Sequence, residues 1–381
     1  FIMFTKKFKV IRQPFPHVLI KTNKELHGWY RGKRECTAER MLINPYNGCS
    51  VGCFYCYARA LPGYFGIFNQ KNIVFVCKDF DKLISRQLDA LNITSCGYLS
   101  PVTDPFQILE GTYHLSEKII EEFIKRNIPI EFITKCKVPE RVIDLMRAQK
   151  HSFGQVSILT TNENLRKILA PGGADTIELF DNLKRLSKKG IFSVLRIDPI
   201  FPFITDDKRE LSRLIERAID SGARHIVASI LDIPLRIKNF VFYNIKKHFG
   251  SGIYLQYNSL YKEKIGYLNA KIDYRRKIFE FLRGFCDKKN ITFSLCMEYE
   301  LKDNKIQGLN QEFMSSKNCE GIDIPLYVKK DKNFEVLYDC SGNCLNCNRP
   351  LCGIKDLAMA RSPDTRKDFK LRDYRRWSRE F

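Results

Sequence analysis

Residues 44–57 read Asn44-Pro45-Tyr46-Asn47-Gly48-Cys49-Ser50-Val51-Gly52-Cys53-Phe54-Tyr55-Cys56-Tyr57. The three cysteines are spaced C-x3-C-x2-C, and no fourth cysteine follows closely. Thiolates suit iron–sulfur clusters, and a cubane has four irons, so three thiolates leave one iron open to a ligand from outside the protein. A structural zinc site would take a fourth protein ligand at similar spacing. We therefore interpret Cys49, Cys53 and Cys56 as ligands of a [4Fe–4S] cluster with one open position.

The bulk composition narrows the class of protein. The chain has 381 residues, of which 44% are hydrophobic, and this is enough for a large buried core. Its 14 cysteines occur in clustered spacings, which favours metal binding in the cytoplasm over a disulfide framework. No apolar run reaches the ~18 residues of a spanning helix, and no signal peptide opens the chain, so we expect a cytoplasmic protein with no membrane partner.

The net charge of +21 is the second strong signal in the composition. A field of this size attracts polyanions and favours a nucleic acid as partner, although a lysine-rich, AT-biased genome would also raise the charge. Residues 361–379 interleave Arg and Lys with aromatic side chains. We expect this tail either to contact nucleic acid or to form a basic helix whose aromatic side chains dock on the core.

Helix and strand periodicities alternate between residues 41 and 300, which predicts an α/β fold of repeated βα units around a parallel sheet. The predicted strands are 41–43, 96–100, 129–134, 154–159, 192–197, 225–230, 252–256 and 291–296. The predicted helices are 79–92, 115–126, 139–148, 163–169, 177–189, 207–220, 236–248 and 272–289. We divide the chain into a basic leader packed on the core (1–40), a barrel (41–300) and a C-terminal extension (301–381).

A second cysteine group lies in the C-terminal extension. It consists of Cys340, Cys344, Cys347 and Cys352, spaced C-x3-C-x2-C-x4-C. Four thiolates satisfy either a zinc ion or a fully ligated second [4Fe–4S] cluster. Both metals remain open, and we slightly favour iron–sulfur. Zinc would indicate a structural or nucleic-acid-binding knuckle, whereas iron would indicate electron transfer or sulfur donation.

The cluster loop and several later segments resemble the signature of spore photoproduct lyase and the "DNA repair photolyase"-like proteins, a family of radical S-adenosylmethionine (SAM) enzymes. The matching segments are Asn44–Arg59, Val102–Gln107, Phe132–Lys135, Gln155–Ile158, Arg166–Pro171 and Leu195–Pro202. The resemblance covers roughly residues 40–300. It implies a partial (β/α)6 TIM-like barrel of the radical SAM type, here with a C-terminal cysteine-rich metal-binding extension.

The resemblance also implies residues that bind the cofactor. The implied SAM-binding residues are Tyr55, Tyr57, Asp104, Lys135, Ser157, Arg166 and Arg196. Lys135 and Ser157 suit the SAM carboxylate because a zwitterion needs a cation and a hydroxyl donor there. Arg196 would bind SAM or a substrate phosphate, or would pair with Asp198. Asp104 would hold a ribose hydroxyl or cap the next turn.

The implied catalytic residues are Tyr57, which would lie against SAM, and a cysteine that donates a hydrogen atom. In the family this cysteine comes just before the T-D segment. Here Pro101 and Val102 occupy that neighbourhood, and Cys96 lies several residues earlier, so Cys96 is the candidate donor by an incomplete match. This departure weakens the expectation of an identical thymine-dimer repair.

The function implied is a radical SAM enzyme that reductively cleaves SAM to a 5′-deoxyadenosyl radical and abstracts a hydrogen atom from a nucleic acid, with DNA favoured over RNA. The reaction would be DNA lesion repair or nucleic-acid modification. A reductant such as flavodoxin or ferredoxin would supply the electron. Two alternatives stay open: a radical SAM enzyme that modifies a peptide or small metabolite with an auxiliary iron–sulfur cluster, and a non-catalytic iron–sulfur protein that binds nucleic acid or senses redox state.

Overall fold

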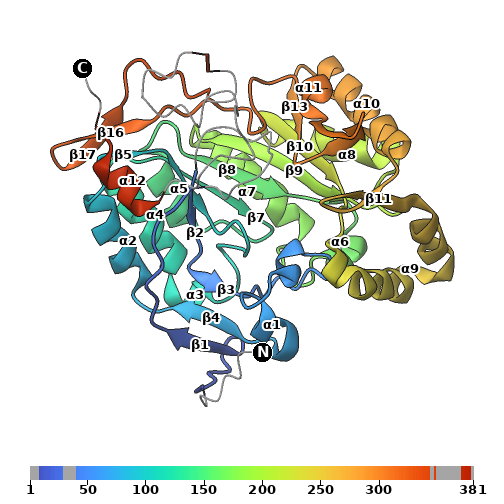
Figure 1. The fold of residues 1–381 in the computed structure, drawn as a ribbon, viewed down its shortest axis with the longest axis horizontal. Coiled ribbons are helices and arrows are strands. Elements are labelled where there is room, and N and C mark those ends of the chain that lie inside the picture. The colour runs from blue at the N-terminus through green and yellow to red at the C-terminus, as the bar shows by residue number, and fades with distance from the viewer. Residues whose placement is uncertain (1–7, 29–39, 344–346, 349–369, 379–381) are drawn as a thin grey trace.

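The computed structural model describes residues 8–28, 40–343, 347–348 and 370–378. Seven parallel strands form its central sheet in the order β13-β10-β9-β8-β7-β6-β2 (Figure 1). These strands are β2 (Arg40–Ile43), β6 (Cys96–Leu99), β7 (Ile130–Thr134), β8 (Phe153–Ser157), β9 (Phe192–Ile200), β10 (His225–Ile230) and β13 (Thr292–Leu295). The sheet does not close, because β2 and β13 have no common ladder. The predicted α/β fold with a partial parallel barrel is confirmed.

Amphipathic helices follow most strands and cover the outer face of the sheet (Figure 1). They include α2 (Phe80–Asp89), α4 (Leu115–Lys125), α5 (Glu140–Met146), α7 (Thr176–Lys188), α8 (Lys208–Asp220) and α10 (Ile272–Lys288). The helices α3 (Glu110–Tyr113), α6 (Glu163–Leu169) and α9 (Lys238–Leu260) follow the loops between these units, and α9 contacts β11 at the margin of the molecule (Figure 1). Each of the eight predicted helices is present. A typical case is α8, where Asp207 caps the first turn and a stripe of leucine and isoleucine side chains is buried against the sheet.

The predicted strand at 252–256 is wrong, because this segment is helical and belongs to α9. Gly250 interrupts that helix with φ 87°, and the helix restarts directly after it. The apolar residues Ile253, Tyr254 and Tyr257 are spaced i, i+1, i+4, which suits one face of a helix. Tyr257 is fully buried, so helical packing outweighed the strand propensity of this short apolar run.

Smaller elements surround the central sheet. Three small sheets and hairpins comprise β1 (His17–Ile20), β4 (Val74–Cys77) and β3 (Tyr46–Asn47); β11 (Tyr261–Ile265) and β12 (Tyr267–Ala270); and β14 (Tyr299–Lys302) and β15 (Lys305–Gly308). A further sheet joins β17 (Asn333–Val336), β16 (Tyr327–Lys330) and β5 (Ile93–Thr94). The remaining helices are η1 (Tyr57–Ala60), α1 (Gly66–Lys71), η2 (Leu235–Ile237), α11 (Asn310–Phe313) and α12 (Leu371–Arg376). None of the described helices has the length and apolar character to cross a membrane.

The loop after α11 closes the end of the barrel where the strands begin. Glu320 on this loop forms a buried ion pair with Arg40, the first residue of β2, and Arg40 also lies 3.3 Å from Glu131 of β7. The carbonyl of Cys319 accepts a hydrogen bond from Ser294 at 2.7 Å. Although burial opposes its charge, Glu320 and Glu131 raise the pKa of Arg40. The opposite end of the barrel, where the strands end, carries the candidate site.

Candidate active site

The cysteine loop leaves β2 through the short strand β3 and reaches η1 at the carboxyl ends of the central strands. Gly48 has φ 99°, and a Cβ atom there would lie 2.9 Å from Cδ2 of Phe68, so both its conformation and its surroundings require glycine. The loop therefore makes a tight turn against α1, and this turn presents Cys49, Cys53 and Cys56 in succession.

The three cysteines are half-buried and free, and they influence one another electrostatically. Burial, followed by Asp104 and Cys53, raises the pKa of Cys49. Burial and Cys53 raise the pKa of Cys56 to about 11, while the Ala58 N–H lies against its sulfur and opposes this rise. When these thiols lose their protons, the resulting thiolates repel one another. A bound metal cation stabilises such thiolates.

The donor set fits a polynuclear cluster better than a single ion. Among the described residues, no three His, Cys, Asp or Glu side chains converge closely enough to hold one metal ion. A cubane instead takes one thiolate on each of three different irons. The buried hydroxyl of Tyr55 lies against the Cys53 thiol, which together with burial raises the pKa of Tyr55. We assign Cys49, Cys53 and Cys56 as the residues that would hold a [4Fe–4S] cluster.

Gln107 fixes the backbone of the cysteine loop. This buried side chain accepts a hydrogen bond from the Ser50 N–H at 3.0 Å and donates to the Gly48 carbonyl at 3.2 Å. Arg59 acts from the other side, where its Nε donates to the Cys53 carbonyl at 2.9 Å. Both residues lie in the motif segments named above, where neither had a predicted role.

The loop after α6 packs directly on the cysteine loop. The Gly172 N–H donates to the Val51 carbonyl at 2.9 Å. A Cβ atom on Gly172 would lie only 2.2 Å from the Ser50 carbonyl oxygen. The neighbouring Ala174 N–H donates to the Lys135 carbonyl, so this glycine-containing loop joins the cysteine loop to the end of β7.

The Asp104 side chain joins its own turn to the end of β7 through hydrogen bonds. One carboxylate oxygen accepts hydrogen bonds from the Phe106 N–H at 2.9 Å and the Thr134 hydroxyl at 2.8 Å. The other accepts from the Lys135 N–H at 2.7 Å. Of the two roles that the sequence left open for Asp104, the geometry matches the capping of its own turn, extended to the end of β7. Both oxygens therefore bind the protein's own backbone and side chains.

Lys135 and Ser157 meet at the ends of the adjacent strands β7 and β8, as the resemblance implied. The Lys135 ammonium donates to the Ser157 hydroxyl at 2.7 Å, and its charge acts on Cys56 and Asp198. Arg166 lines the same small cavity. Its guanidinium is bound within its own segment, to Glu163 at 2.6 Å and to the carbonyl of Ala170 at 2.8 Å. Arg166 thus holds the loop that supports the cysteines.

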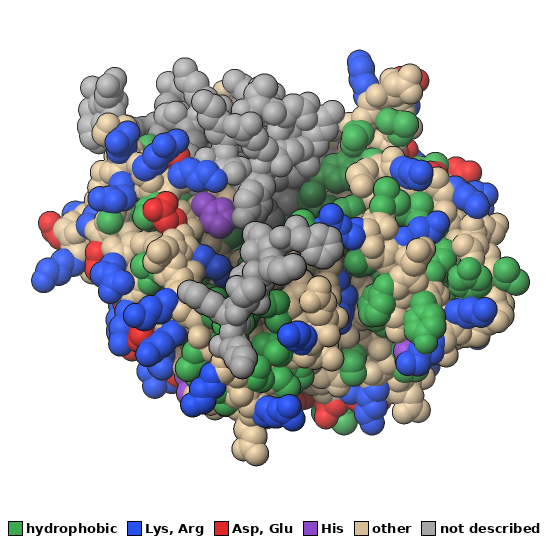
Figure 2. All heavy atoms as spheres, turned by 60° about the horizontal axis from the view of Figure 1, so that its bottom comes forward, with side chains coloured by type: hydrophobic (Ala, Val, Ile, Leu, Met, Phe, Trp, Pro, Cys, Tyr) green, Lys and Arg blue, Asp and Glu red, His purple; other side chains and the backbone are tan. Residues whose placement is uncertain are grey.

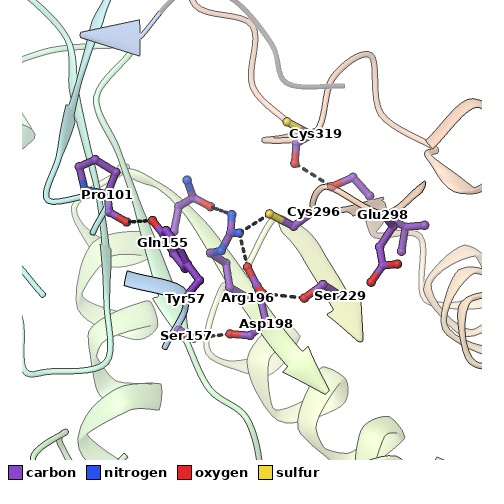
Figure 3. Close-up of polar contacts among 12 residues, drawn as sticks. Tyr57, Pro101, Gln155, Ser157, Arg196, Asp198, Ser229, Cys296, Glu298 and Cys319 are labelled. Carbon is purple, nitrogen blue, oxygen red and sulfur yellow. Dashed lines mark hydrogen bonds and ion pairs between the residues drawn. The ribbon is translucent and has the colours of Figure 1, made fainter. Parts of the chain in front are cut away.

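Arg196 is the centre of a polar network that spans several strands (Figure 3). It donates to Gln155 at 3.0 Å, to Asp198 at 2.5 Å and to the Cys296 sulfur at 2.8 Å. Ser229 donates to the other oxygen of Asp198 at 2.6 Å. Although burial opposes the charge, Arg196 and Ser229 hold the pKa of Asp198 below its ordinary value.

The two tyrosines of the cysteine loop differ in exposure. Tyr55 is buried, and its ring packs edge-on against Phe201, with centroids 4.8 Å apart. Tyr57 is 40% exposed, and its hydroxyl donates to the Pro101 carbonyl at 2.6 Å (Figure 3). The Tyr57 ring therefore stands at the open end of the barrel, near Asp198 and Cys296, which both act on it electrostatically.

Asp232 joins this set from the loop directly after β10, and it was not among the predicted site residues. Burial, then Glu298 and Asp198, raises the pKa of Asp232 to about 8. Glu298 is itself paired with Arg275 at 2.9 Å. Asp232 and Cys296 come from strands far apart in the sequence, and neither lies in a recognisable motif. Their position after strands β10 and β13 was the one available signal.

Cys96 does not lie with these residues. It is the first residue of β6, fully buried, and its ionisable neighbours are Arg40, Glu131 and Glu320 at the opposite end of the barrel. Its assignment as the hydrogen-atom donor is therefore not retained. Pro101, in the neighbourhood where the family has its donor, accepts a hydrogen bond from Tyr57 through its carbonyl.

The structure describes two of the four cysteines in the C-terminal group, Cys340 and Cys347. Cys340 and Cys347 are half-buried and free, and the Cys340 sulfur accepts a hydrogen bond from the Leu326 N–H at 3.3 Å. Cys344 and Cys352 lie outside the described residues, as does most of the basic tail. Within the described end of that tail, α12 buries Leu371 and Tyr374. That end docks on the body of the protein, so Tyr374 is not available to stack on a base.

Residues 43–215 match the Radical SAM superfamily. This match runs from the end of β2 into α8 and contains the cysteine loop, so this part of the chain is similar to radical SAM domains. A protein of Pseudomonas phage M6, described as a radical SAM Nalpha-GlyT isomerase, is 26% identical over 382 aligned positions, which cover 92% of this chain and 78% of that protein. An uncharacterized protein of Methanocaldococcus jannaschii is 29% identical over 169 positions, 44% of this chain and 62% of its own.

Solved structures of spore photoproduct lyase share the fold. A variant of that enzyme with bound AdoMet and dinucleoside spore photoproduct superposes with a TM-score of 0.53 and 13% identity. The alignment covers 71% of this chain and 79% of that one. The structural resemblance inferred from the cysteine loop is thereby confirmed at the level of the fold.

Proposed function

We propose that this protein is a radical SAM enzyme that reductively cleaves SAM and abstracts a hydrogen atom from a nucleic-acid substrate. The observation that carries the proposal is the juxtaposition of the three-cysteine loop with the Lys135–Ser157 pair and the Arg196–Asp198 network at one end of the barrel. A bound [4Fe–4S] cluster supplies the electron that splits a carbon–sulfur bond of SAM into methionine and a 5′-deoxyadenosyl radical.

The residues of the chain bind and orient the reactants. The Lys135 ammonium and the Ser157 hydroxyl are suited to the carboxylate of SAM, since a cation and a hydroxyl donor both favour an anionic group. The partly exposed Tyr57 ring provides a surface beside the cysteines. Asp232 is suited to a hydroxyl or amine group of a ligand, because it carries carboxyl oxygens at the open end of the barrel.

The charge of the chain and the similar proteins support a nucleic-acid substrate. A net charge of +21 favours a polyanion. Spore photoproduct lyase, which has the same fold, binds a dinucleoside in its solved structures. We propose DNA before RNA on this basis, flavodoxin or ferredoxin as reductant, and the cytoplasm as the compartment. We also propose that Cys340, Cys344, Cys347 and Cys352 bind a second iron–sulfur cluster or zinc.

Two outcomes of hydrogen abstraction are open to such an enzyme. Spore photoproduct lyase supports lesion cleavage, whereas the phage M6 relative supports isomerisation. The phage relative matches 92% of this chain, including much of the C-terminal extension, while the lyase structures match 71%. Because the phage relative also matches the C-terminal extension, we favour isomerisation of a nucleotide over a simple lyase reaction.

The test compares nucleic-acid substrates directly. Anaerobically reconstituted protein is incubated with dithionite and SAM, with genomic DNA, RNA or no polymer. Formation of 5′-deoxyadenosine is measured, and the polymer is digested to nucleosides for mass spectrometry. We expect DNA to stimulate 5′-deoxyadenosine above the polymer-free rate and to yield an altered nucleoside.

The nucleoside product separates the two outcomes. An isomerisation gives a nucleoside of unchanged mass and altered retention, whereas a lyase reaction gives fragments whose masses sum to the substrate. Equal 5′-deoxyadenosine formation with and without every polymer, together with unchanged nucleosides, would contradict the nucleic-acid proposal.

A further inference from the structure

The first half of α9 presents a continuous exposed face beside the cysteine loop. Helical spacing brings Asn239, Phe240, Tyr243, Lys246 and Lys247 to one side, while Val241, Phe242, Asn244 and Ile245 are buried on the other. Arg236 extends this face from η2. We call the six exposed residues, Arg236, Asn239, Phe240, Tyr243, Lys246 and Lys247, the α9 face.

The cations of the α9 face have no acidic partner within the described part of the chain. The sequence contains no Asp or Glu from residue 233 to residue 262. Among the described residues, no ion pair involves Arg236, Lys246 or Lys247. Other surface helices differ, since Arg276 of α10 pairs with two glutamates and Lys125 of α4 pairs with Glu121. A locally uncompensated positive charge favours an anionic partner.

Aromatic side chains stand among these cations. Tyr243 is 63% exposed and Phe240 is 45% exposed. They lie one helical turn apart on the same side as the lysines. Exposed aromatic rings next to cations provide the combination that binds single-stranded nucleic acid, because bases stack on the rings while phosphates meet the charges. Figure 2 shows hydrophobic and basic side chains interspersed on one face of the molecule.

The α9 face is joined to the cysteine loop. The Arg59 guanidinium lies over the Phe240 ring at 5.4 Å, while its Nε donates to the Cys53 carbonyl. The Phe54 and His248 rings are stacked at a centroid distance of 6.1 Å. A strand lying on this face would therefore pass close to the candidate site.

We propose that the α9 face binds a single-stranded segment of the nucleic-acid substrate and guides it to the open end of the barrel. Lys246, Lys247 and Arg236 contact phosphates, and Tyr243 stacks on a base. This inference rests on the proposed function. It adds the surface that recognises the polymer and the strandedness that this surface prefers.

The experiment measures polymer binding and SAM cleavage separately. The reconstituted full chain is titrated into a fluorescently labelled oligodeoxythymidylate of about 20 nucleotides, and into a duplex of equal length, over a series of KCl concentrations. The variants are Lys246→Ala/Lys247→Ala and Tyr243→Ala. The control is Lys184→Ala/Lys188→Ala, which removes the same charge from exposed positions on α7.

We expect the single strand to bind more tightly than the duplex. The double lysine variant should bind it about tenfold more weakly at low salt, with a salt slope lower by about 1.4, the contribution of two phosphate contacts on a single strand. Tyr243→Ala should weaken binding about fivefold or more with an unchanged slope. The control should bind like the wild type.

Polymer-free SAM cleavage separates this inference from the proposed function. All variants should keep the wild-type rate of 5′-deoxyadenosine formation without polymer. Wild-type cleavage with equal binding by the α9 variants and the α7 control would overturn the α9 inference alone. Tighter binding of duplex than of single strand would also overturn it. No cleavage by fully loaded wild type would overturn the proposed function itself.

Discussion

Gln107 and Asp104 show how single buried side chains assemble the site. Gln107 bonds the backbone of the cysteine loop, and Asp104 bonds the end of β7. The sequence predicted the meeting of Lys135 with Ser157, because both follow adjacent strands within family motifs. It could not predict Asp232 or Cys296, because their place in the site depends on how distant strands come together.

Replacing Gln107 with leucine should loosen the cysteine loop. The Ser50 N–H and the buried Gly48 carbonyl would lose their partner, which costs about 1–3 kcal/mol of stability. Iron retention should weaken about 10-fold or more, as for other residues that orient metal ligands. Iron content after gel filtration checks this. Ile108→Ala, at an adjacent exposed position, is the control, and equal iron loss in both variants would contradict the role of Gln107.

Asp232 should make the stability depend on pH. Its pKa is about 8 in the folded protein against an ordinary 3.8, so the folded state holds a proton that the unfolded state releases. Stability should therefore fall as pH rises between these values. The charged groups around it are Glu298, Asp198 and Arg275, and the neutral phenols of Tyr261 and Tyr267 also lie near it.

The substitution Asp232→Asn removes this titration. The variant should gain about 2 kcal/mol relative to wild type at pH 9 and much less at pH 5, less than the full pKa shift would give because Asp232 is partly exposed. Denaturant unfolding at both pH values measures the difference. Asp303→Asn, in the exposed β14–β15 turn, should show no such trend. A stability difference that does not change with pH would contradict the raised pKa.

At the scale of elements, periodicity predicted nearly all of the central barrel. Seven of the eight predicted strands form the parallel sheet, and all eight helices are present. The strand predicted at 252–256 was wrong because a short apolar run fits a helix and a strand equally well. Gly250 interrupts α9 just before this run, so the sequence did not show that the helix continues. The small sheets were not predicted, since strands such as β3 and β5 have two residues each.

The contact between the α6–α7 loop and the cysteine loop should be intolerant of any side chain. Gly172→Ala would bring a Cβ atom against the Ser50 carbonyl, so the two loops must separate. We expect a loss of about 1–3 kcal/mol in stability together with reduced iron retention. Thermal unfolding and iron analysis measure both. Gly284→Ala in α10 is the control, because open space there predicts a neutral or slightly stabilising effect.

At the scale of the whole molecule, buried polar groups connect the two ends of the barrel. The Arg40–Glu131 pair is linked through Gln155 to Arg196 and from there to Asp198. Glu320 closes this chain although it is 280 residues from Arg40 in the sequence. Contacts between residues so far apart cannot be predicted from local sequence patterns. The sequence therefore did not indicate how the C-terminal extension attaches to the barrel.

Removing Glu320 should destabilise the whole fold. Glu320→Ala removes the carboxylate that pairs with the buried Arg40 guanidinium, and breaking a buried ion pair costs about 3–5 kcal/mol. Chemical denaturation measures this loss. Glu335→Ala breaks the exposed pair with Lys330 and should cost under about 1 kcal/mol. Equal effects of the two substitutions would show that Glu320 does not anchor the extension.

The central claim is that the loop of Cys49, Cys53 and Cys56 supports radical cleavage of SAM. The most direct measurement is 5′-deoxyadenosine and methionine formed by anaerobically reconstituted, dithionite-reduced protein, compared with its Cys53→Ala variant. We predict both products in equal amounts from the wild type and none above background from the variant. Wild-type protein that retains its full iron and forms no 5′-deoxyadenosine would contradict the claim.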